Sequence, residues 1–413
     1  MMKDRLFKIM VVAVRLPLCL PLRLPLCLPL RLSLCLAFCL PLCLPLCLPL
    51  CPSVCAQDVP VPSVGRVVRH TDVPSTWVPS RPVDVWLPPT YDGKTPHDVL
   101  IMHDGQMLFD ASGTWNGTEW RVDEVLSDLI AQGHVRPTLV VGVWNRPGFR
   151  HVEYTPQKPI DNLEGPVRTG VLSMRRPDGE PLFPDGMVES DAYLKFLVTE
   201  LLPFVRSHYV TDKEAGHNYL MGSSMGGLIS LYGWMEYPEV FEGAACLSTH
   251  WPVGFDAKTT QAKLLLEYLR KSVPEPARRR LYMDTGDQEL DAWYLPSQSQ
   301  ADSIFMDAGY SPKQYRSRVA AGHRHNEVDW AKRLPEAFRF LMGTGVEPVK
   351  GTGVEPVKGT GVEPVKGTAV EPVKGTGVEP VKGTGVEPVK GTGVEPVNGK
   401  GEGNSVKPAK PKN

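Results

Sequence analysis

The segment His217-Asn218-Tyr219-Leu220-Met221-Gly222-Ser223-Ser224-Met225-Gly226-Gly227 carries the strongest structural signal in this chain. Its apolar beginning predicts a buried strand, and the residues from Leu228 to Glu236 predict a helix. A Gly-x-Ser-x-Gly sequence between a strand and a helix is typical of a strained turn that presents a serine hydroxyl. Glycine at positions 222 and 226 leaves room for this turn. We therefore expect Ser224 to be a nucleophile at the start of a helix.

Continuous apolar runs on both sides of this segment predict further strands that are covered on both faces. The predicted strands are residues 82–87, 98–102, 138–143, 219–221, 244–247 and 280–283. Apolar residues at helical spacing lie between them, over residues 120–132, 191–209, 258–271, 297–308 and 327–342. This alternation predicts an α/β fold, with a mainly parallel, doubly wound sheet flanked by helices.

Composition divides the chain into three parts. Residues 1–56 are rich in Leu, Pro and Cys, residues 57–342 have the mixed composition of a globular domain, and residues 343–413 are repetitive. The middle part is long enough to bury a large core as one domain. The formal net charge of −1 gives no electrostatic reason to expect binding to nucleic acid.

The N-terminal part resembles an export signal. Basic residues precede an apolar run, and Val54-Cys55-Ala56 provides small side chains where a signal peptidase would cut before Gln57. Proline at every fourth position disfavours a membrane-spanning helix, and Leu50 before Cys51 fits a lipoprotein site poorly. We expect a cleaved signal peptide, no stable membrane span after cleavage, and a periplasmic or extracellular protein.

The C-terminal part repeats Gly-Thr-Gly-Val-Glu-Pro-Val-Lys. It contains no aromatic residue and too little apolar surface to offset the entropy of ordering, which predicts a disordered spacer.

Cysteine usage excludes a disulfide framework in the middle part. Eight of the nine cysteines lie in residues 1–56, and Cys246 alone lies in the predicted domain, within an apolar run. We expect Cys246 to be a buried, inert thiol and expect no metal site.

A serine nucleophile needs a base and an acid, and in folds of this class the chain order is serine, acid, histidine. His325 precedes the last predicted helix and is the expected base, with His323 as its rival. The other histidines are expected to be surface or structural residues. The loop after the strand at 280–283 offers four carboxylates: Asp284, Asp287, Glu289 and Asp291. Spacing alone does not choose among them; Asp291 is preferred and Glu289 is the second choice.

The oxyanion that forms during acyl transfer needs two backbone N–H donors. The residue after the nucleophile, Met225, is expected to supply one. The turn Met102-His103-Asp104-Gly105-Gln106 follows an early strand and is expected to supply the second from Gln106, with Gly105 as the alternative.

These motifs together resemble the Putative esterase family of the α/β-hydrolase superfamily, which includes enterochelin esterases, feruloyl esterases, S-formylglutathione hydrolase and antigen 85 mycolyl transferases. The matching pieces span about residues 83–342: Met102 to Gln106, Gly142 to Asn145 with Arg150, Glu153 and Tyr154, Gly222 to Gly227, Asp284 to Gly286 with Leu290 to Ala292, and Gly322 to Glu327 with Trp330.

The resemblance implies an α/β-hydrolase fold, a serine carboxylic-ester hydrolase with a Ser224, His325 and Asp291 triad, and no cofactor. It favours Asp291 through the pattern that ends at Tyr294, whereas other branches place the acid at Glu289. The expected partner is a small-molecule ester. An acyltransferase and a non-catalytic binding protein are the alternatives. Trp115, Trp144, Trp251 and Trp293 are expected either to line an aromatic pocket or to pack in the core.

Overall fold

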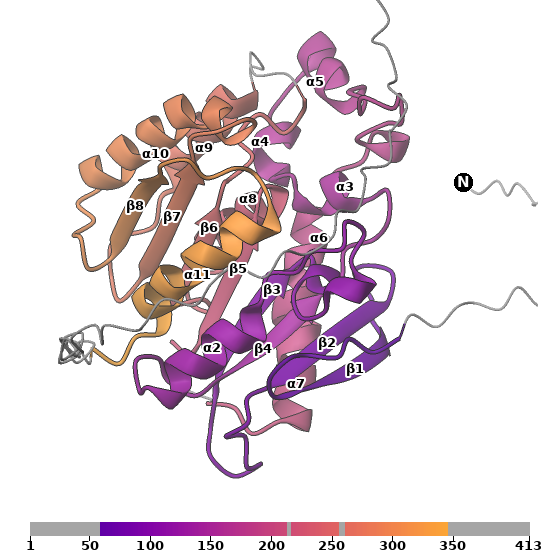
Figure 1. Ribbon diagram of the computed structural model, residues 1–413. Coiled ribbons are helices and arrows are strands. Elements are labelled where there is room, and N and C mark those ends of the chain that lie inside the picture. The colour runs from indigo at the N-terminus through magenta and orange to yellow at the C-terminus, as the bar shows by residue number, and fades with distance from the viewer. Residues whose placement is uncertain (1–57, 213–215, 256–260, 346–413) are drawn as a thin grey trace, which may run out of the picture. The chain divides into compact units, whose positions relative to one another are not determined.

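The computed structural model describes residues 58–212, 216–255 and 261–345, and its centre is an eight-stranded β-sheet (Figure 1). The expected signal segment and nearly all of the expected repeat tail lie outside the described residues. Gly343 and Thr344, the first residues of the repeats, are described. The N–H of Thr344 donates to the carbonyl oxygen of His134 at 3.1 Å, and Gly343 forms a β-bridge with Val135.

The strands form one sheet in the order β1-β2-β4-β3-β5-β6-β7-β8. Their bounds are β1 Arg66–Val73, β2 Arg81–Leu87, β3 Asp98–His103, β4 Thr138–Val143, β5 Asn218–Ser223, β6 Gly243–Leu247, β7 Arg280–Gly286 and β8 Tyr315–Ala320. All neighbours from β4 to β8 pair in parallel, and β2 is antiparallel to both of its neighbours. The expected mainly parallel sheet is confirmed.

The central strands are buried on both faces, as their apolar runs predicted. Every residue of β3, β4, β5 and β6 is buried. Cys246 in β6 is fully buried, and burial raises the pKa of its thiol, as expected of an inert cysteine. The edge strands β1 and β8 carry charged and exposed residues, so they lack the apolar signal by which we predicted strands.

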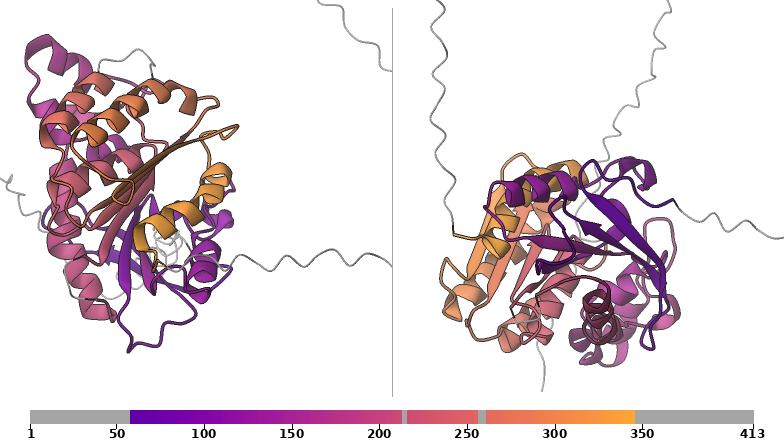
Figure 2. Two further views of the ribbon diagram at one scale, coloured as in Figure 1. Left: turned by 90° about the vertical axis from the view of Figure 1, so that its left-hand side faces the viewer. Right: turned by 90° about the horizontal axis from the view of Figure 1, so that it is seen from below.

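Helices cover both faces of the sheet, which Figure 2 shows edge-on in its left view. One face packs against α2 Val122–Ala131 and α11 Glu327–Met342, which contact each other. The other face packs against the remaining long helices: α6 Ser190–Phe196, α7 Leu202–His208, α8 Met225–Glu236, α9 Gln261–Ser272 and α10 Leu295–Asp307. This three-layer arrangement is the expected doubly wound α/β sandwich.

Two helical regions differ from the sequence-based expectation. The single helix expected over 191–209 contains a π-helical segment, η4 Leu197–Leu201, between α6 and α7. Pro203 in the first turn of α7 has no N–H to donate back into that segment. Between β4 and α6 the chain adds three short helices that we did not predict: α3 Arg150–Tyr154, α4 Gln157–Asp161 and α5 Gly165–Leu172.

The remaining short helical turns are η1 Gly105–Met107, η2 Ala111–Gly113, η3 Pro184–Gly186 and η5 Asp291–Trp293. None of the helices in the described ranges has the length and apolar character needed to cross a membrane. The C-terminal ends of the parallel strands β3, β5 and β7 meet at one edge of the sheet, where loops place functional side chains in folds of this kind.

Candidate active site

Ser224 occupies a strained turn between β5 and α8. Its backbone has φ 57° and ψ −121°, a conformation that costs a non-glycine residue about 1–3 kcal/mol. The turn is held because the N–H of Ser224 donates to the carbonyl oxygen of Leu247 at 2.9 Å. A Cβ on Gly222 would lie 2.6 Å from the backbone of Gly226, so only glycine fits there. The serine retains 9 % of its surface exposed at the start of α8.

His325 and Asp291 form a direct pair at the same edge of the sheet. The Nδ1–H of His325 donates to Oδ1 of Asp291 at 2.5 Å. His325 stands just before α11, whose first turn is capped by the side chain of Asn326, which accepts the N–H of Asp329 at 2.9 Å. Asp291 begins η5, which follows β7 after the short loop 287–290, and is fully buried.

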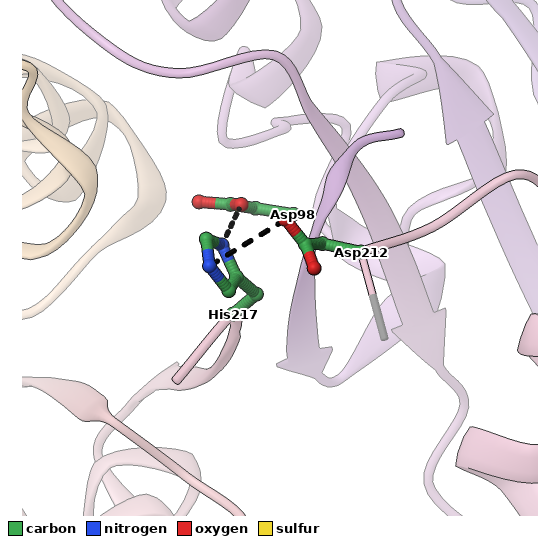
Figure 3. A group of neighbouring side chains, drawn as sticks. All are labelled: Asp98, Asp212 and His217. Atoms are coloured by element: carbon green, nitrogen blue, oxygen red, sulfur yellow. Dashed lines mark hydrogen bonds and ion pairs between the residues drawn. The ribbon is translucent and has the colours of Figure 1, made fainter. Parts of the chain in front are cut away.

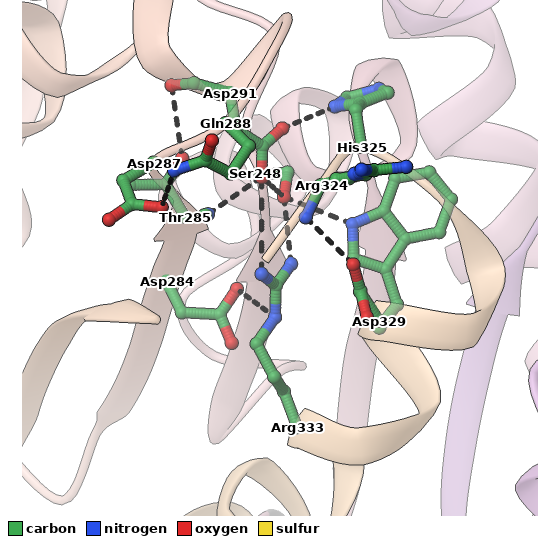
Figure 4. A network of polar contacts seen from close by, with 12 residues as sticks. Ser248, Asp284, Thr285, Asp287, Gln288, Asp291, Arg324, His325, Asp329 and Arg333 are labelled. Atoms are coloured by element: carbon green, nitrogen blue, oxygen red, sulfur yellow. Dashed lines mark hydrogen bonds and ion pairs between the residues drawn. The ribbon is translucent and has the colours of Figure 1, made fainter. Parts of the chain in front are cut away.

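The second oxygen of Asp291 is held by two donors (Figure 4). Oδ2 accepts the hydroxyl hydrogen of Ser248 at 2.6 Å and the N–H of Gly286 at 2.6 Å. The oxygen of Ser248 in turn accepts N–H groups from Trp330 at 3.0 Å and from Arg333 at 2.8 Å. The indole of Trp330 and the guanidinium of Arg333 can only donate hydrogen bonds. The single hydroxyl hydrogen of Ser248 must therefore point at Asp291.

These contacts keep Asp291 ionised in a buried place. Burial by itself raises the pKa of this carboxyl. The hydrogen bond and charge of His325 lower it, as do the hydrogen bonds from Ser248 and Gly286. Together these contacts outweigh the effect of burial and hold the pKa below its usual value. The buried guanidinium of Arg333 lies 3.9 Å from Asp291 and adds a positive charge. A charged Asp291 orients the His325 ring so that Nε2 is free to act as a base.

The neighbouring carboxylate, Asp284, lies within β7 and faces Arg333 (Figure 4), 3.3 Å from its Nε. Burial raises the pKa of Asp284 to about 6, although the charge of Arg333 opposes the rise. Asp284 pairs with Arg333, whereas Asp291 bonds to the ring of His325, so Asp291 is the carboxylate beside this histidine.

Asp284 gives a pH-dependent stability prediction. Because its native pKa of about 6 exceeds the ordinary 3.8, its stabilising contribution is full below about pH 4 and is lost as the pH rises through 6. Asp284→Asn cannot ionise, so its unfolding free energy relative to the wild type should rise between pH 4 and pH 7, by up to about 3 kcal/mol. Urea unfolding at several pH values measures this. A difference that stays constant with pH would contradict it.

The alternatives for acid and base lie elsewhere. Glu289 is 62 % exposed and faces Arg324 at 3.5 Å, so it does not contact His325. The carbonyl oxygen of His323 accepts the N–H groups of Asp287 and Gln288, and its ring Nδ1 is buried with no hydrogen-bond partner among the described residues. Burial, which spacing could not show, distinguishes Asp291 from Glu289.

The two proposed oxyanion donors lie on segments that contact each other. Met225 is the first residue of α8, and its N–H belongs to the first turn, where N–H groups have no partner within the helix. Gln106 lies in η1, directly after β3. A Cβ on Gly105 would lie 2.4 Å from the backbone of Gly142, and a Cβ on Gly226 would lie 3.3 Å from Asp104. The η1 turn therefore packs against β4, and its neighbour Asp104 packs against α8.

Asp104 anchors this turn, and we did not assign it a role from the sequence. Arg150 donates to both of its oxygens, at 2.9 and 2.7 Å, and the side-chain amide of Asn145 donates to Oδ1 at 2.6 Å. The hydroxyl of Tyr154 accepts the N–H of Asp104 at 3.3 Å. Asp104 and its three partners all belong to the motif pieces quoted above. Their hydrogen bonds hold the η1 turn in place beside Ser224.

His250 is buried, within the expected range of surface or structural histidines, and its backbone N–H donates to the carbonyl oxygen of Ser224 at 3.1 Å. The expectation for the tryptophans needs correction. Among the four tryptophans, Trp251 is buried in the core, but Trp115 is 82 % exposed and Trp293 is 42 % exposed. Trp144 covers Arg69, whose guanidinium lies 4.5 Å from its ring.

A separate polar group lies at the opposite edge of the sheet, where β3 and β5 begin (Figure 3). Asp98, Asp212 and His217 present oxygen and nitrogen atoms within 4.8 Å of one another. The oxygens of Asp98 already accept Nδ1–H of His217 at 2.6 Å and Nε–H of Arg136 at 2.8 Å. The three residues form an ion-pair network that connects the starts of β3 and β5. Ser224 lies at the other end of β5.

A mainly parallel eight-stranded sheet, with a serine at a strained strand-to-helix turn and a histidine–carboxylate pair at the same edge, defines an α/β-hydrolase. Residues 175–341 match the model of the family described as Putative esterase. This segment contains Ser224, Asp291 and His325, so the match confirms the resemblance seen in the motifs and gives the activity class, carboxylic ester hydrolysis.

The chain is also similar to individual proteins. It is 22 % identical over 273 residues to protein YbbA of Bacillus subtilis (strain 168), a match that covers 64 % of this chain and 93 % of that protein. Among solved structures it is similar to a ferulic acid esterase, with a TM-score of 0.46 and 18 % identity over 67 % of this chain and 98 % of the other. It is also similar to an IroE-like serine hydrolase from Shewanella oneidensis, with a TM-score of 0.47 and 18 % identity over 67 % of this chain and 80 % of the other.

Proposed function

We propose that this protein hydrolyses carboxylic esters through an acyl-enzyme, with Ser224 as nucleophile, His325 as general base and Asp291 as the orienting acid. The observation that carries the proposal is that the strained turn at Ser224 and the His325–Asp291 pair meet at one edge of the sheet. Tyr294 lies between the two, because its ring is 5.7 Å from that of His325 and its hydroxyl bonds at 2.6 Å to the ring of His250. The backbone N–H of His250 in turn donates to the carbonyl oxygen of Ser224.

The proposed reaction follows from these positions. Nε2 of His325 takes the proton of Ser224 while Oγ attacks the ester carbonyl carbon. The N–H groups of Met225 and Gln106 bind the oxyanion, where each donor is worth about 3 kcal/mol of barrier. The tetrahedral intermediate collapses, the alcohol leaves with the proton from His325, and water then attacks the acyl-enzyme by the same route.

The acyl-enzyme can be tested directly. We expect a burst of p-nitrophenol from p-nitrophenyl acetate, with an amplitude equal to the enzyme concentration, when acylation outpaces deacylation. Acid quenching during the burst should leave one acetyl group on the peptide that contains Ser224. Hydrolysis without any acylated peptide, under conditions where the burst is complete, would point to direct attack by water and contradict the proposal.

We also propose that the chain is exported, as a domain of about residues 57–342 that follows a cleaved signal segment. The basic residues, the apolar run and Ala56 at the expected cleavage point support this. Cell fractionation and N-terminal sequencing of the protein expressed with its own leader test it, with Gln57 as the expected first residue. An uncleaved protein in the cytoplasm would contradict it.

A further inference from the structure

Asp104 places a negative charge against the first turn of α8. A Cβ built on Gly226, the second residue of that helix, would lie 3.3 Å from Oδ2 of Asp104. The backbone of Asp104 has φ 57° and ψ 46°, a left-handed conformation that aspartate and asparagine tolerate better than most residues. Its carboxylate therefore faces the positive end of the helix dipole, which also attracts the negative charge that develops on an ester carbonyl oxygen.

The two N–H groups assigned to the oxyanion lie beside this charge. Met225 is the first residue of α8, and Gln106 lies in η1, which begins directly after Asp104. Within the described ranges neither N–H group donates to another oxygen, so both are free to bind an oxyanion. An uncompensated carboxylate at this place would compete for the same positive potential.

Arg150 meets the carboxylate with two parallel hydrogen bonds. Nε–H donates to Oδ1 at 2.9 Å and Nη2–H donates to Oδ2 at 2.7 Å, the bidentate geometry of a strong arginine–carboxylate pair. Nη2 also donates to the carbonyl oxygen of Ser223, the last residue of β5, at 3.4 Å. Burial raises the pKa of Asp104, but the charge and bonds of Arg150, with the bond from Asn145, outweigh it and lower the pKa. The pair is therefore ionised and has no net charge.

The helix that carries Arg150 is anchored by a different ion pair. Glu153, also in α3, accepts one hydrogen bond on each oxygen from Arg81 of β2, both at 2.7 Å. The side chains of Arg81 and Glu153 are 2 % and 0 % exposed. This buried pair holds α3 against the sheet independently of residue 150. Removal of the Arg150 side chain should therefore change the charge beside the oxyanion donors without releasing α3.

We propose that Arg150 is a positioning residue for the oxyanion site, where it cancels the charge of Asp104 and joins the η1 turn to the end of β5. The inference rests on the proposed function. When Oγ of Ser224 bonds to the ester carbonyl carbon, the carbonyl oxygen becomes negative. The neutral pair leaves the helix dipole and the two N–H groups to act on that oxygen, whereas Asp104 alone would repel it.

Arg150→Met removes the positive charge and keeps an unbranched stem. We expect kcat to fall about a hundredfold, with KM changed by less than threefold, because an unpaired charge a few ångströms from the developing oxyanion acts mainly on the transition state. Asp104→Asn removes the negative charge and keeps a residue that tolerates the left-handed backbone, so alone it should lower kcat by no more than about threefold.

The double variant, Arg150→Met with Asp104→Asn, separates charge from structure. If Arg150 cancels the charge of Asp104, loss of that charge removes the repulsion, and the double variant should be at least about tenfold more active than Arg150→Met alone. If Arg150 only held the turn, the second substitution would weaken the turn further and deepen the loss. Rescue of kcat is therefore the result that a purely structural role does not give.

Arg146→Met controls for the loss of a cation near α3. The side chain of Arg146 is 22 % exposed and pairs with Glu153 at 3.5 Å. Its removal changes the net charge by the same amount but leaves Asp104 paired, so kcat should change by less than about twofold. Thermal unfolding shows whether each variant is folded. Arg150→Gln takes the place of Arg150→Met if the methionine variant does not fold.

Phenylboronic acid probes the oxyanion site without turnover. Its boron bonds to Oγ of Ser224 while the serine proton passes to His325, which leaves a tetrahedral anion that resembles the intermediate. We expect the inhibition constant of Arg150→Met to rise by about the factor by which its kcat/KM falls, and to recover in the double variant with Asp104→Asn.

Fluorophosphonate labelling separates failure of this inference from failure of the proposed function. A wild type that is not labelled at Ser224 would overturn the proposed function itself. A labelled wild type would overturn only the role of Arg150 in two cases: if Arg150→Met keeps kcat within about threefold, or if adding Asp104→Asn gives no recovery. A higher KM with unchanged kcat would also overturn it, because Arg150 would then bind the substrate.

Discussion

Ser224→Ala is expected to lose ester hydrolysis by at least about ten-thousandfold while it keeps the fold. The alanine cannot form the acyl-enzyme, and the remaining groups give only the weak catalysis that an oxyanion site supplies alone. Initial rates with a short p-nitrophenyl ester measure the loss, and circular dichroism checks the fold. Activity that stays within tenfold of the wild type would exclude Ser224 as the nucleophile.

Replacing Ser224 by glycine is expected to abolish activity but to raise stability. Ser224 has φ 57°, which glycine adopts freely and alanine does not. We therefore expect Ser224→Gly to be as inactive as Ser224→Ala but to unfold with a free energy higher by about 1 kcal/mol. Equal stability of the two variants would mean that the turn stores no strain.

Asp291→Asn is the second change with a large expected effect. The amide removes the negative charge beside His325 and, with its NH₂ toward Nδ1, favours the tautomer in which Nε2 carries the proton and cannot act as a base. We expect kcat to fall by roughly a thousandfold or more, with the fold retained, because Ser248 and Gly286 keep an oxygen to donate to.

Glu289→Gln is the matched control for Asp291→Asn. Glu289 stands two residues away, is 62 % exposed, and contacts Arg324 in place of His325. Its loss should change kcat by less than about twofold, because an exposed ion pair contributes little. If Glu289→Gln lost activity as severely as Asp291→Asn, the acid would be misassigned.

The sequence predicted the centre of the fold well because buried parallel strands leave an unambiguous apolar signal. β4 and α11 have the predicted bounds, and β5 and α8 frame Ser224 as the glycines at 222 and 226 indicated. The edge strands β1 and β8 were missed because their exposed faces carry charge. The short helices α3 to α5 were missed because each is too short to show a helical period.

The site was predictable only where chemistry is tied to a local motif. Ser224 and His325 stand in recognisable surroundings, but four carboxylates within eight residues share one loop, and only burial separates Asp291 from Glu289. The supporting residues Ser248, His250 and Arg333 have no local motif. Ser248 and His250 are placed by a loop with positive φ, and Arg333 is placed by one face of α11. Their positions at the site follow from the folded chain and leave no local signal in the sequence.

The central claim is that one hydroxyl, that of Ser224, carries the reaction. The most direct measurement is reaction of the full chain with a fluorophosphonate, followed by intact mass analysis and peptide mapping. We predict one adduct per chain, on the peptide that contains Ser224, with loss of esterase activity in proportion to labelling. Full labelling at another residue, or undiminished activity after Ser224 is fully modified, would contradict the account.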